Sequence, residues 1–383
     1  MNPLEKLEDV LRSCDRVFVG IICLLVSLAF YWTGFLQILT AFLPSIFYLP
    51  TIAAIAGLLR LLVERRLGQK KLPSEGKAVF ITGCDSGFGN SLSRRLANRG
   101  YVVFAGCIDE NSEGAASLRD YSKSIKTLQL NVTKEQDLLA VEEEITAHLN
   151  RENLQLWAVI ANAGVLHETP LELSPMSEIE NLINVNLLGV FRTVKALLPA
   201  VRKCKGRIIV TSSLSATFAF PYLVSYSVSK TAVKAFCQGL HRELRKFEVT
   251  CISIEPTFYR TPLLNRTGPT PADRLQQVDD ERKQAYSFFI NEYEKLMKGM
   301  YKLADTNIEA PINAFEDAVC SARPKRSYVL APLQYRILTY ISSHFDLCFT
   351  DLFINALISP WKTILEIVRH QYDRLSSLDA SKY

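Results

Sequence analysis

From residue 76 onward, short apolar runs alternate with longer amphipathic stretches that have helical periodicity. Strands and helices in this order fold into a parallel sheet covered by helices on both faces, because right-handed crossovers connect successive strands. The sequence therefore predicts an α/β fold with a doubly wound parallel sheet. The expected strands are residues 78–82, 101–105, 126–130, 157–161, 206–212, 249–254 and 328–331, and the expected helices include 91–98, 135–149, 176–203 and 225–246.

The N-terminal region is different, because residues 17–59 contain no charged side chain. A membrane-spanning helix needs about 20 apolar residues, so this segment is long enough for two, with a break expected at residues 44–50. We therefore expect an N-terminal transmembrane helical hairpin. The basic side chains that follow it predict a cytosolic location for the rest of the chain. A single crossing, which would place the following domain in a lumen, is the alternative.

These patterns divide the chain into three regions. Residues 1–72 form the membrane anchor with a basic juxtamembrane segment, residues 73–332 form the α/β domain, and residues 333–383 form an apolar and aromatic extension. Within the domain, residues 261–316 are expected to be an insertion, either a lid over a substrate site or a surface excursion. The extension fits an interfacial helix, a subunit contact or a cover over an apolar pocket, because its charges argue against a third spanning helix.

The charge balance and the cysteines exclude two classes of function. The chain has 44 Lys and Arg against 39 Asp and Glu, a net charge of +5, so nucleic acid is not an expected partner. The nine cysteines include no C-x-x-C pair and no Cys/His spacing that suits zinc, so we expect no metal site.

A glycine-rich turn, TGCDSGFG, lies between the first expected strand and the following helix. Such a turn lets the backbone approach a pyrophosphate, and the N-terminus of the helix offers unpaired N–H groups to it. This context predicts a Rossmann-like dinucleotide site. Its candidate residues are Thr82, Gly83, Ser86, Gly87, Phe88 and Gly89.

The end of the second expected strand carries acidic residues and no Lys or Arg, with Asp109 as the candidate for contacting the cofactor. A carboxylate accepts hydrogen bonds from the ribose hydroxyls and repels a 2′-phosphate, so the sequence favours NAD over NADP. The alternative is that Asp109 only opens a turn or a helix.

Tyr226 and Lys230 are four residues apart in an expected helix, so they lie on the same face. A free tyrosine has a pKa of about 10, but a nearby ammonium and a positive nicotinamide ring both favour the phenolate. Ser213 follows an expected strand, where its hydroxyl can point into the cleft and bind a substrate oxygen. His167, on the loop after another strand, is interpreted as a surface residue, with a contact to substrate as the alternative.

Together these motifs resemble the short-chain dehydrogenase/reductase family. The resemblance covers residues 77–331 and includes ANAG at 161–164, NVNLLG at 184–189, the serine and the Y-x-x-x-K pair in the family's order. The segments TGCDSGFG, VFAGCI and IEPTFYRT resemble the branch that contains retinol dehydrogenases, 17β-hydroxysteroid dehydrogenase type 2 and D-3-hydroxybutyrate dehydrogenase. Among these enzymes, the hydrophobic N-terminal segment most resembles that of 17β-hydroxysteroid dehydrogenase type 2.

The resemblance implies a role for each matching residue. Tyr226 would be the general acid/base, Lys230 would hold the nicotinamide ribose and lower the pKa of the tyrosine, and Ser213 would orient the substrate oxygen. The further implied residues are Asn186 at the water of a proton relay, Asn162 and Gly164 beside the cofactor, Asn131 near its adenine and Thr261 near its carboxamide. A dimer or tetramer is also implied.

Two positions depart from the family pattern. Ala161 replaces the first asparagine of N-N-A-G, and Thr257 replaces the glycine that usually follows Pro256. We interpret the threonine as altering the fit of the cofactor, because the glycine lets the backbone pass close to the nicotinamide.

The sequence is thus interpreted as an NAD-dependent oxidoreductase that interconverts an alcohol and a carbonyl on a lipophilic steroid- or retinol-type substrate. An endoplasmic reticulum membrane location with a cytosolic catalytic domain is expected. One alternative is a dehydrogenase of a small hydroxy acid of the 3-hydroxybutyrate type at a mitochondrial membrane. Another is a membrane-bound scaffold that binds nucleotide but does not turn over substrate.

Overall fold

The computed structural model describes residues 24–28, 51–59, 70–264, 269–287, 290 and 306–344. The chain divides into two compact units. One comprises Met1–Leu72 with Ser321–Pro324, and the other comprises Pro73–Cys320 with Lys325–Tyr383. The second unit contains the sheet and the cleft described below.

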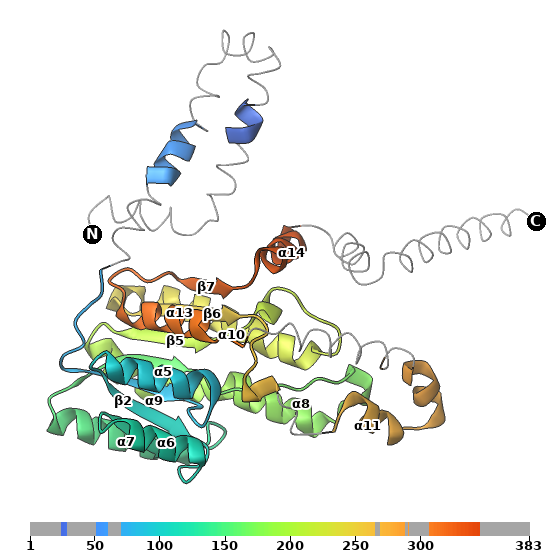
Figure 1. Cartoon of the computed structure of the whole chain (residues 1–383), viewed down its shortest axis with the longest axis horizontal. Helices are drawn as coiled ribbons and strands as arrows, with labels where there is room; N and C mark the ends of the chain where they lie inside the picture. Colours follow the sequence, from blue (N-terminus) through green and yellow to red (C-terminus); the bar gives the residue numbers. More distant parts are fainter. Residues whose placement is uncertain are drawn as a thin grey trace, which may run out of the picture. The chain divides into compact units, whose positions relative to one another are not determined.

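Seven parallel strands form the sheet, in the order β3-β2-β1-β4-β5-β6-β7 (Figure 1). This order confirms the predicted doubly wound sheet, and each strand begins and ends within two residues of its predicted bounds. The strand order reverses between β1 and β4, because β2 and β3 are added on one side of β1 and β4 to β7 on the other. In such sheets, ligands bind beyond the carboxyl ends of the strands at the place where the order reverses. The strands are β1 (Lys77–Thr82), β2 (Val102–Cys107), β3 (Ile125–Gln129), β4 (Gln155–Ala161), β5 (Arg207–Thr211), β6 (Thr250–Pro256) and β7 (Ser327–Leu330).

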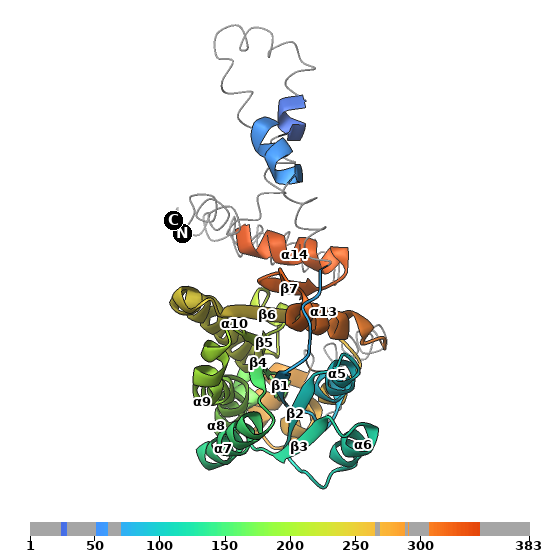
Figure 2. The ribbon, with the colours of Figure 1, turned by 90° about the vertical axis from the view of Figure 1, so that its left-hand side faces the viewer.

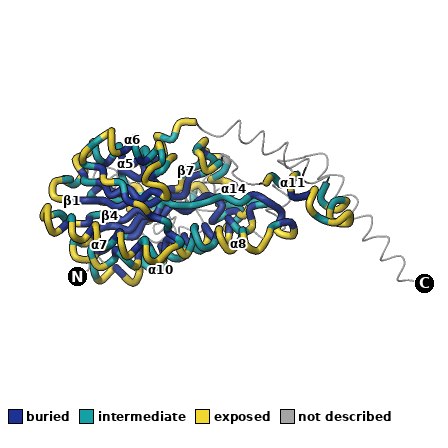
Figure 3. The backbone as a smooth tube through the Cα atoms, turned by 90° about the horizontal axis from the view of Figure 1, so that it is seen from below, coloured by how far each residue is buried: buried dark blue, intermediate teal, exposed yellow. Residues whose placement is uncertain are grey.

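The central strands are continuously apolar because helices cover both faces of the sheet (Figure 2). In β1, Ala78 and Phe80 belong to one buried cluster, while Val79 and Ile81 belong to the other. The burial colouring of Figure 3 shows the same pattern, with dark strands inside and exposed outer helix faces. One face packs against α7 (Glu135–Arg151), α9 (Gly189–Lys203) and α10 (Val224–Leu244), and the other against α5 (Gly87–Asn98), α6 (Glu113–Tyr121) and α13 (Glu309–Cys320).

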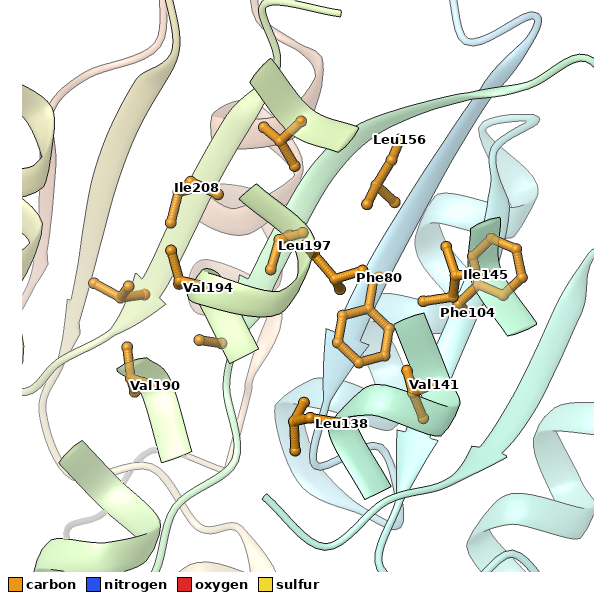
Figure 4. Packing of buried hydrophobic residues seen from close by; sticks show 14 of the residues in the cluster. Phe80, Phe104, Leu138, Val141, Ile145, Leu156, Val190, Val194, Leu197 and Ile208 are labelled. Carbon is orange, nitrogen blue, oxygen red and sulfur yellow. The ribbon is translucent and has the colours of Figure 1, made fainter. Parts of the chain in front are cut away.

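The first of these clusters fills the space between β1 and its covering helices. Phe80 projects from β1 toward Val141 of α7 and Leu197 of α9, and all three side chains are at most 3% exposed (Figure 4). Burying one such side chain stabilises a fold by roughly 2 kcal/mol. The packing therefore fixes the strand ends that carry the site.

The predicted helix 176–203 consists of three parts: α8 (Met176–Ile183), a π-helical turn η2 (Asn184–Leu188) and α9. Among the described residues, Met176–Lys203 is also the single helix that is long and apolar enough to cross a membrane. However, α9 packs on β4 within the buried core. We therefore assign this helix to the core of the domain.

The predicted transmembrane hairpin lies largely outside the described residues. Residues 24–28 and 51–59 are helical, and Leu25, Ile52 and Leu58 are each more than half exposed. The hairpin stays a prediction.

Residues 261–316 are not a simple insertion, because their C-terminal part forms the sheet-covering helix α13. A solvent-exposed surface excursion was one of the two expectations for this segment. However, Glu316 is only 3% exposed and pairs with Arg95 at 2.9 Å and with Arg99 at 2.5 Å. Two shorter elements, η5 (Pro262–Leu264) and α11 (Pro271–Gln276), precede α13, and α14 (Leu333–His344) follows β7.

Candidate active site

A cleft of about 720 Å³ opens at the carboxyl ends of the strands. Its walls include residues that directly follow five strands: Gly83 after β1, Ile108 after β2, Asn162 after β4, Ser212 after β5 and Thr257 after β6. In Figure 1, α8 and α11 lie beyond the arrowheads of the strands, on the same side as this cleft. The position is the one expected for the ligand site of a doubly wound sheet.

The glycine-rich turn has almost no space for side chains. Gly83 has a φ of +71°, and a Cβ on Gly89 would lie 2.2 Å from the carbonyl oxygen of Gly83. The helix α5 begins at Gly87, and its N-cap residue Ser86 makes no side-chain capping hydrogen bond. The first-turn N–H groups of α5 are therefore suited to an anion, and the pyrophosphate contact of this turn stays a prediction.

Thr82 and Asn162 connect this turn to the neighbouring strand β4. The Thr82 hydroxyl oxygen accepts hydrogen bonds from the backbone N–H groups of Asn162 and Ala163, both at 3.0 Å. The Asn162 amide donates to the carbonyl oxygens of Thr82 and Gly83, at 3.0 and 3.2 Å. The two side chains thus fix the backbone of the cofactor loop, and the cofactor contact implied for Asn162 stays a prediction.

Asp85 is a functional candidate that the sequence analysis missed. Its carboxylate accepts hydrogen bonds from the backbone N–H groups of Ile108 and Asp109, at 3.0 and 3.3 Å, and so ties the glycine turn to the end of β2. Asp109 itself is exposed and accepts a hydrogen bond from the N–H of Asn111 at 2.9 Å. The carboxylate of Asp85 therefore lies near the end of β2 in addition to that of Asp109, which the sequence analysis had singled out.

Other predicted cofactor residues line the same cleft. Asn131 and Gly164 are among its wall residues, and the Asn131 side chain accepts hydrogen bonds from the backbone N–H and the hydroxyl of Thr133, at 3.0 and 2.7 Å. Thr261 lies over Gly87, where an added Cβ would come within 3.6 Å of it. Phe88 packs edge-on against Tyr259, with the ring centroids 5.9 Å apart.

Ser213, Tyr226 and Lys230 come together at the cleft, as the sequence predicts. Tyr226 and Lys230 are one turn apart on α10, with the Lys230 ammonium 5.7 Å from the centroid of the tyrosine ring. Lys230 donates to the carbonyl oxygen of Thr211 at 2.9 Å. Ser213 accepts a hydrogen bond from the N–H of Ser215 at 3.2 Å as it caps η3 (Leu214–Ala216).

Burial controls the ionisation of the two titratable groups. It raises the pKa of Tyr226 to about 12, and a hydrogen bond with Ser213 opposes part of this increase. Burial also lowers the pKa of Lys230 to about 8. In the protein by itself, desolvation therefore raises the pKa of Tyr226, which is opposite to the lowering that the resemblance implies.

The side chain of Asn186 holds a loop of the cleft. It is fully buried in the π-helical turn, accepts a hydrogen bond from the N–H of Val165 at 2.8 Å, and donates to the carbonyl oxygen of Val165 at 2.9 Å. A π-helical turn inside an α-helix is frequently found at functional sites. The proton-relay water implied for Asn186 stays a prediction.

Thr257, one of the two departures from the family pattern, is held in place by its own side chain. Its N–H and its hydroxyl both donate to the carbonyl oxygen of Leu330, at 3.3 and 3.1 Å, and its φ is not positive. A threonine is therefore accommodated here without the backbone strain that would require glycine.

The interpretation of His167 as a surface residue was wrong. Its side chain is 14% exposed, lines the cleft, and places Nδ1 2.8 Å from the Glu178 carboxylate. Glu178 also pairs with Arg274, which lines the cleft and is 6% exposed. These contacts join a loop after β4 to α8 and α11, and no short sequence motif could have indicated them.

The comparisons with known proteins agree with this geometry. The family model for the short chain dehydrogenase matches residues 77–272. This chain belongs to that family. Estradiol 17-beta-dehydrogenase 2 of Rattus norvegicus is 31% identical over 317 residues, which is 81% of each chain. Retinol dehydrogenase 16 of Rattus norvegicus is 33% identical over 288 residues, 73% of this chain and 88% of the relative.

A solved structure supports the fold. The short chain dehydrogenase/reductase of Burkholderia phymatum in complex with NAD has a TM-score of 0.56 at 22% identity, covering 70% of this chain and 94% of the other. The two relatives place this short-chain dehydrogenase in the branch of retinol and steroid dehydrogenases. With the family match, they show an oxidoreductase that acts on CH–OH groups with a nicotinamide cofactor.

Proposed function

We propose that the chain is an NAD-dependent oxidoreductase that interconverts an alcohol and a carbonyl on a lipophilic substrate of the steroid or retinol type. The observation that carries this proposal is the convergence of Ser213, Tyr226 and Lys230 on a cleft that also contains the glycine-rich turn. Proton transfer, orientation of the substrate oxygen and cofactor binding can therefore occur in one cavity.

In this proposal, Tyr226 exchanges a proton with the substrate oxygen while Ser213 orients that oxygen. The raised pKa keeps Tyr226 protonated at neutral pH, so it can donate to a carbonyl during reduction. For oxidation it must accept the alcohol proton, and the Lys230 ammonium favours the phenolate form. A nicotinamide ring bound in the cleft would supply or accept the hydride. Lys230 would also hold the nicotinamide ribose.

The part of the cleft around Tyr226 supports a lipophilic substrate. Leu182, Leu223 and Tyr226 form a small apolar cluster. Val165, Leu166, Phe220 and Phe258 contribute further apolar lining. An apolar wall of this kind favours a hydrocarbon skeleton over a short hydroxy acid, because burying a carboxylate against such side chains is costly.

The carboxylates of Asp85 and Asp109 near the end of β2 support NAD over NADP. Asp85 holds the backbone of Ile108 and Asp109 in position, and Asp109 is exposed there. Both negative charges would repel a 2′-phosphate on the adenosine ribose.

We also propose that residues 17–59 anchor the enzyme in the endoplasmic reticulum membrane, with the catalytic domain on the cytosolic side. The uncharged segment and the basic residues after it support this location. A membrane-bound enzyme encounters substrates that partition into lipid, which agrees with the apolar cleft.

Turnover by the full-length chain in a membrane fraction tests the proposal. The substrates are steroid alcohols, retinol and 3-hydroxybutyrate with either NAD or NADP, and the key variant is Tyr226→Phe. We expect NAD-linked oxidation of a steroid alcohol or retinol that falls at least about a hundredfold in the variant. The control is Tyr121→Phe, at an exposed tyrosine outside the cleft. Unchanged turnover in Tyr226→Phe would overturn the mechanism.

A further inference from the structure

A buried ion pair connects α10, the helix of Tyr226 and Lys230, to the strand β6 beside it (Figure 2). Lys234 is on α10, one turn after Lys230 and two turns after Tyr226, and Glu255 is in β6. The Lys234 ammonium is 2.9 Å from the Glu255 carboxylate, and the Glu255 side chain is only 1% exposed. Neither residue lines the cleft. Any role of the pair in the reaction must therefore act through other residues.

Both carboxylate oxygens of Glu255 accept hydrogen bonds. Its Oε1 accepts from the hydroxyls of Ser253 in β6 and Ser327 in β7, each at 2.7 Å, and its Oε2 accepts from Lys234. The two serines are partners in the pairing of β6 with β7. The sheet therefore holds the carboxylate in one position, and the carboxylate in turn holds the Lys234 ammonium.

Lys234 also holds the turn that carries Ser213. Its ammonium donates to the hydroxyl of Thr217 at 2.8 Å, and Thr217 is the C-cap residue of η3, whose N-cap residue is Ser213. Thr231, on the same face of α10 as Lys234, donates to the carbonyl oxygen of Ala216 at 3.1 Å. The C-terminal end of this turn is therefore attached to α10 by two side chains, one of which is also fixed to the sheet.

The position of Ser213 relative to Tyr226 affects the proton transfer. Burial raises the pKa of Tyr226, and the hydrogen bond with Ser213 lowers it. In the proposed reaction, both hydroxyls also contact the same substrate oxygen, and a small misplacement of such groups lowers the rate by a large factor. A buried ion pair adds little net stability because desolvation offsets its attraction, but its charge-assisted hydrogen bonds are directional. The pair is therefore better suited to fixing positions than to stabilising the fold.

We propose that Lys234 is a positioning residue for the reaction. Held by Glu255, it keeps the turn of Ser213 at the place on α10 where the hydroxyls of Ser213 and Tyr226 meet one substrate oxygen. This inference rests on the proposed function and adds a residue outside the cleft to the groups that the reaction needs.

Two variants of the full-length enzyme test this role, with NAD and the steroid alcohol or retinol that the wild type oxidises. Thr217→Val removes the hydroxyl that binds Lys234 and leaves the ion pair in place. Lys234→Met/Glu255→Gln removes both charges together, because Lys234→Met alone would leave a buried charge unpaired and destabilise the fold. The matched control is Lys205→Met/Glu248→Gln, because these paired side chains are 61% and 66% exposed and lie outside the cleft.

We expect kcat for oxidation to fall about tenfold in Lys234→Met/Glu255→Gln and about threefold in Thr217→Val, while KM for NAD changes less than about twofold. Oxidation requires Tyr226 to lose its proton, so kcat rises with pH through the pKa of this residue. The pH at half-maximal kcat should increase by about half a unit in both variants, because a displaced Ser213 no longer lowers this pKa. The control should match the wild type in kcat and in its pH profile.

Unchanged kcat in both variants would overturn the role of Lys234 and leave the proposed function intact. A fall in kcat without a shift of the pH profile, or with an equal loss of NAD affinity, would show that the pair only supports the fold, which would also overturn this role. No NAD-linked turnover by the wild-type enzyme on any of these substrates would overturn both proposals.

Discussion

The two halves of the cleft differ in whether backbone or side chains form their walls. The cofactor half is formed by backbone, with glycines packed so closely that an added Cβ on Gly89 would meet a carbonyl oxygen at 2.2 Å. The half proposed for the substrate is formed by side chains on α8, α11 and the loops after β4 and β6, including His167, Glu178 and Arg274. A backbone cradle fits a common cofactor, whereas a side-chain surface can be changed to fit a particular substrate.

Gly89→Ala is the sharpest test of the cofactor half. The methyl group would collide with backbone of the Gly83 turn, which cannot move aside as a flexible side chain could. We expect the affinity for NAD to fall roughly tenfold to a hundredfold, as measured by fluorescence titration of the purified chain. Gly239→Ala is the matched control, because nothing lies within 4 Å of its added Cβ. Unchanged NAD affinity in Gly89→Ala would show that the turn does not have to be this tight.

Lys230→Met tests the residue that both halves share. Burial lowers the pKa of Lys230 from 10.5 to about 8, so below pH 8 the native state contains a costly buried ammonium. As the pH rises from 8 toward 10.5, the folded protein releases this proton while the unfolded chain keeps it, and wild-type stability rises.

We therefore expect Lys230→Met to abolish turnover and yet to stabilise the protein by about 2 kcal/mol at pH 7, with a smaller gain at pH 10. Thermal unfolding of the two proteins at both pH values measures the difference. A variant that is less stable than wild type at pH 7 would contradict this account of the buried lysine.

Asp109→Ser gives the smallest expected change. Removing the Asp109 carboxylate should raise the ratio of NADP- to NAD-linked kcat/KM roughly tenfold, because the repulsion of a 2′-phosphate is reduced. Asp85 is not a suitable target, since its carboxylate also holds two backbone N–H groups. Glu110→Ser, at the neighbouring exposed residue, is the control. A larger change in Glu110→Ser than in Asp109→Ser would show that Glu110, and not Asp109, determines the cofactor selectivity.

The sequence predicted the features that depend on local patterns. The central strands were found because strands buried on both faces are rich in apolar residues, and the glycine turn was found because its residues lie together in the chain. The helix α13 was missed because Glu316 suggests a solvated surface until Arg95 and Arg99 pair with it across the fold. Arg274 was missed for the same reason: its partner Glu178 lies 96 residues away in the sequence.

The strand order also has a consequence for the way the domain can be made. The strand β2 pairs with β1, β3 pairs with β2, and β4 then pairs with the free side of β1. From there, β5, β6 and β7 each pair with the strand immediately before them in the sequence. During translation, each emerging strand therefore finds its neighbour already synthesised, so the sheet can grow in the direction of synthesis. The nucleotide cradle can form early, while the serine, tyrosine and lysine are added only when the second half leaves the ribosome.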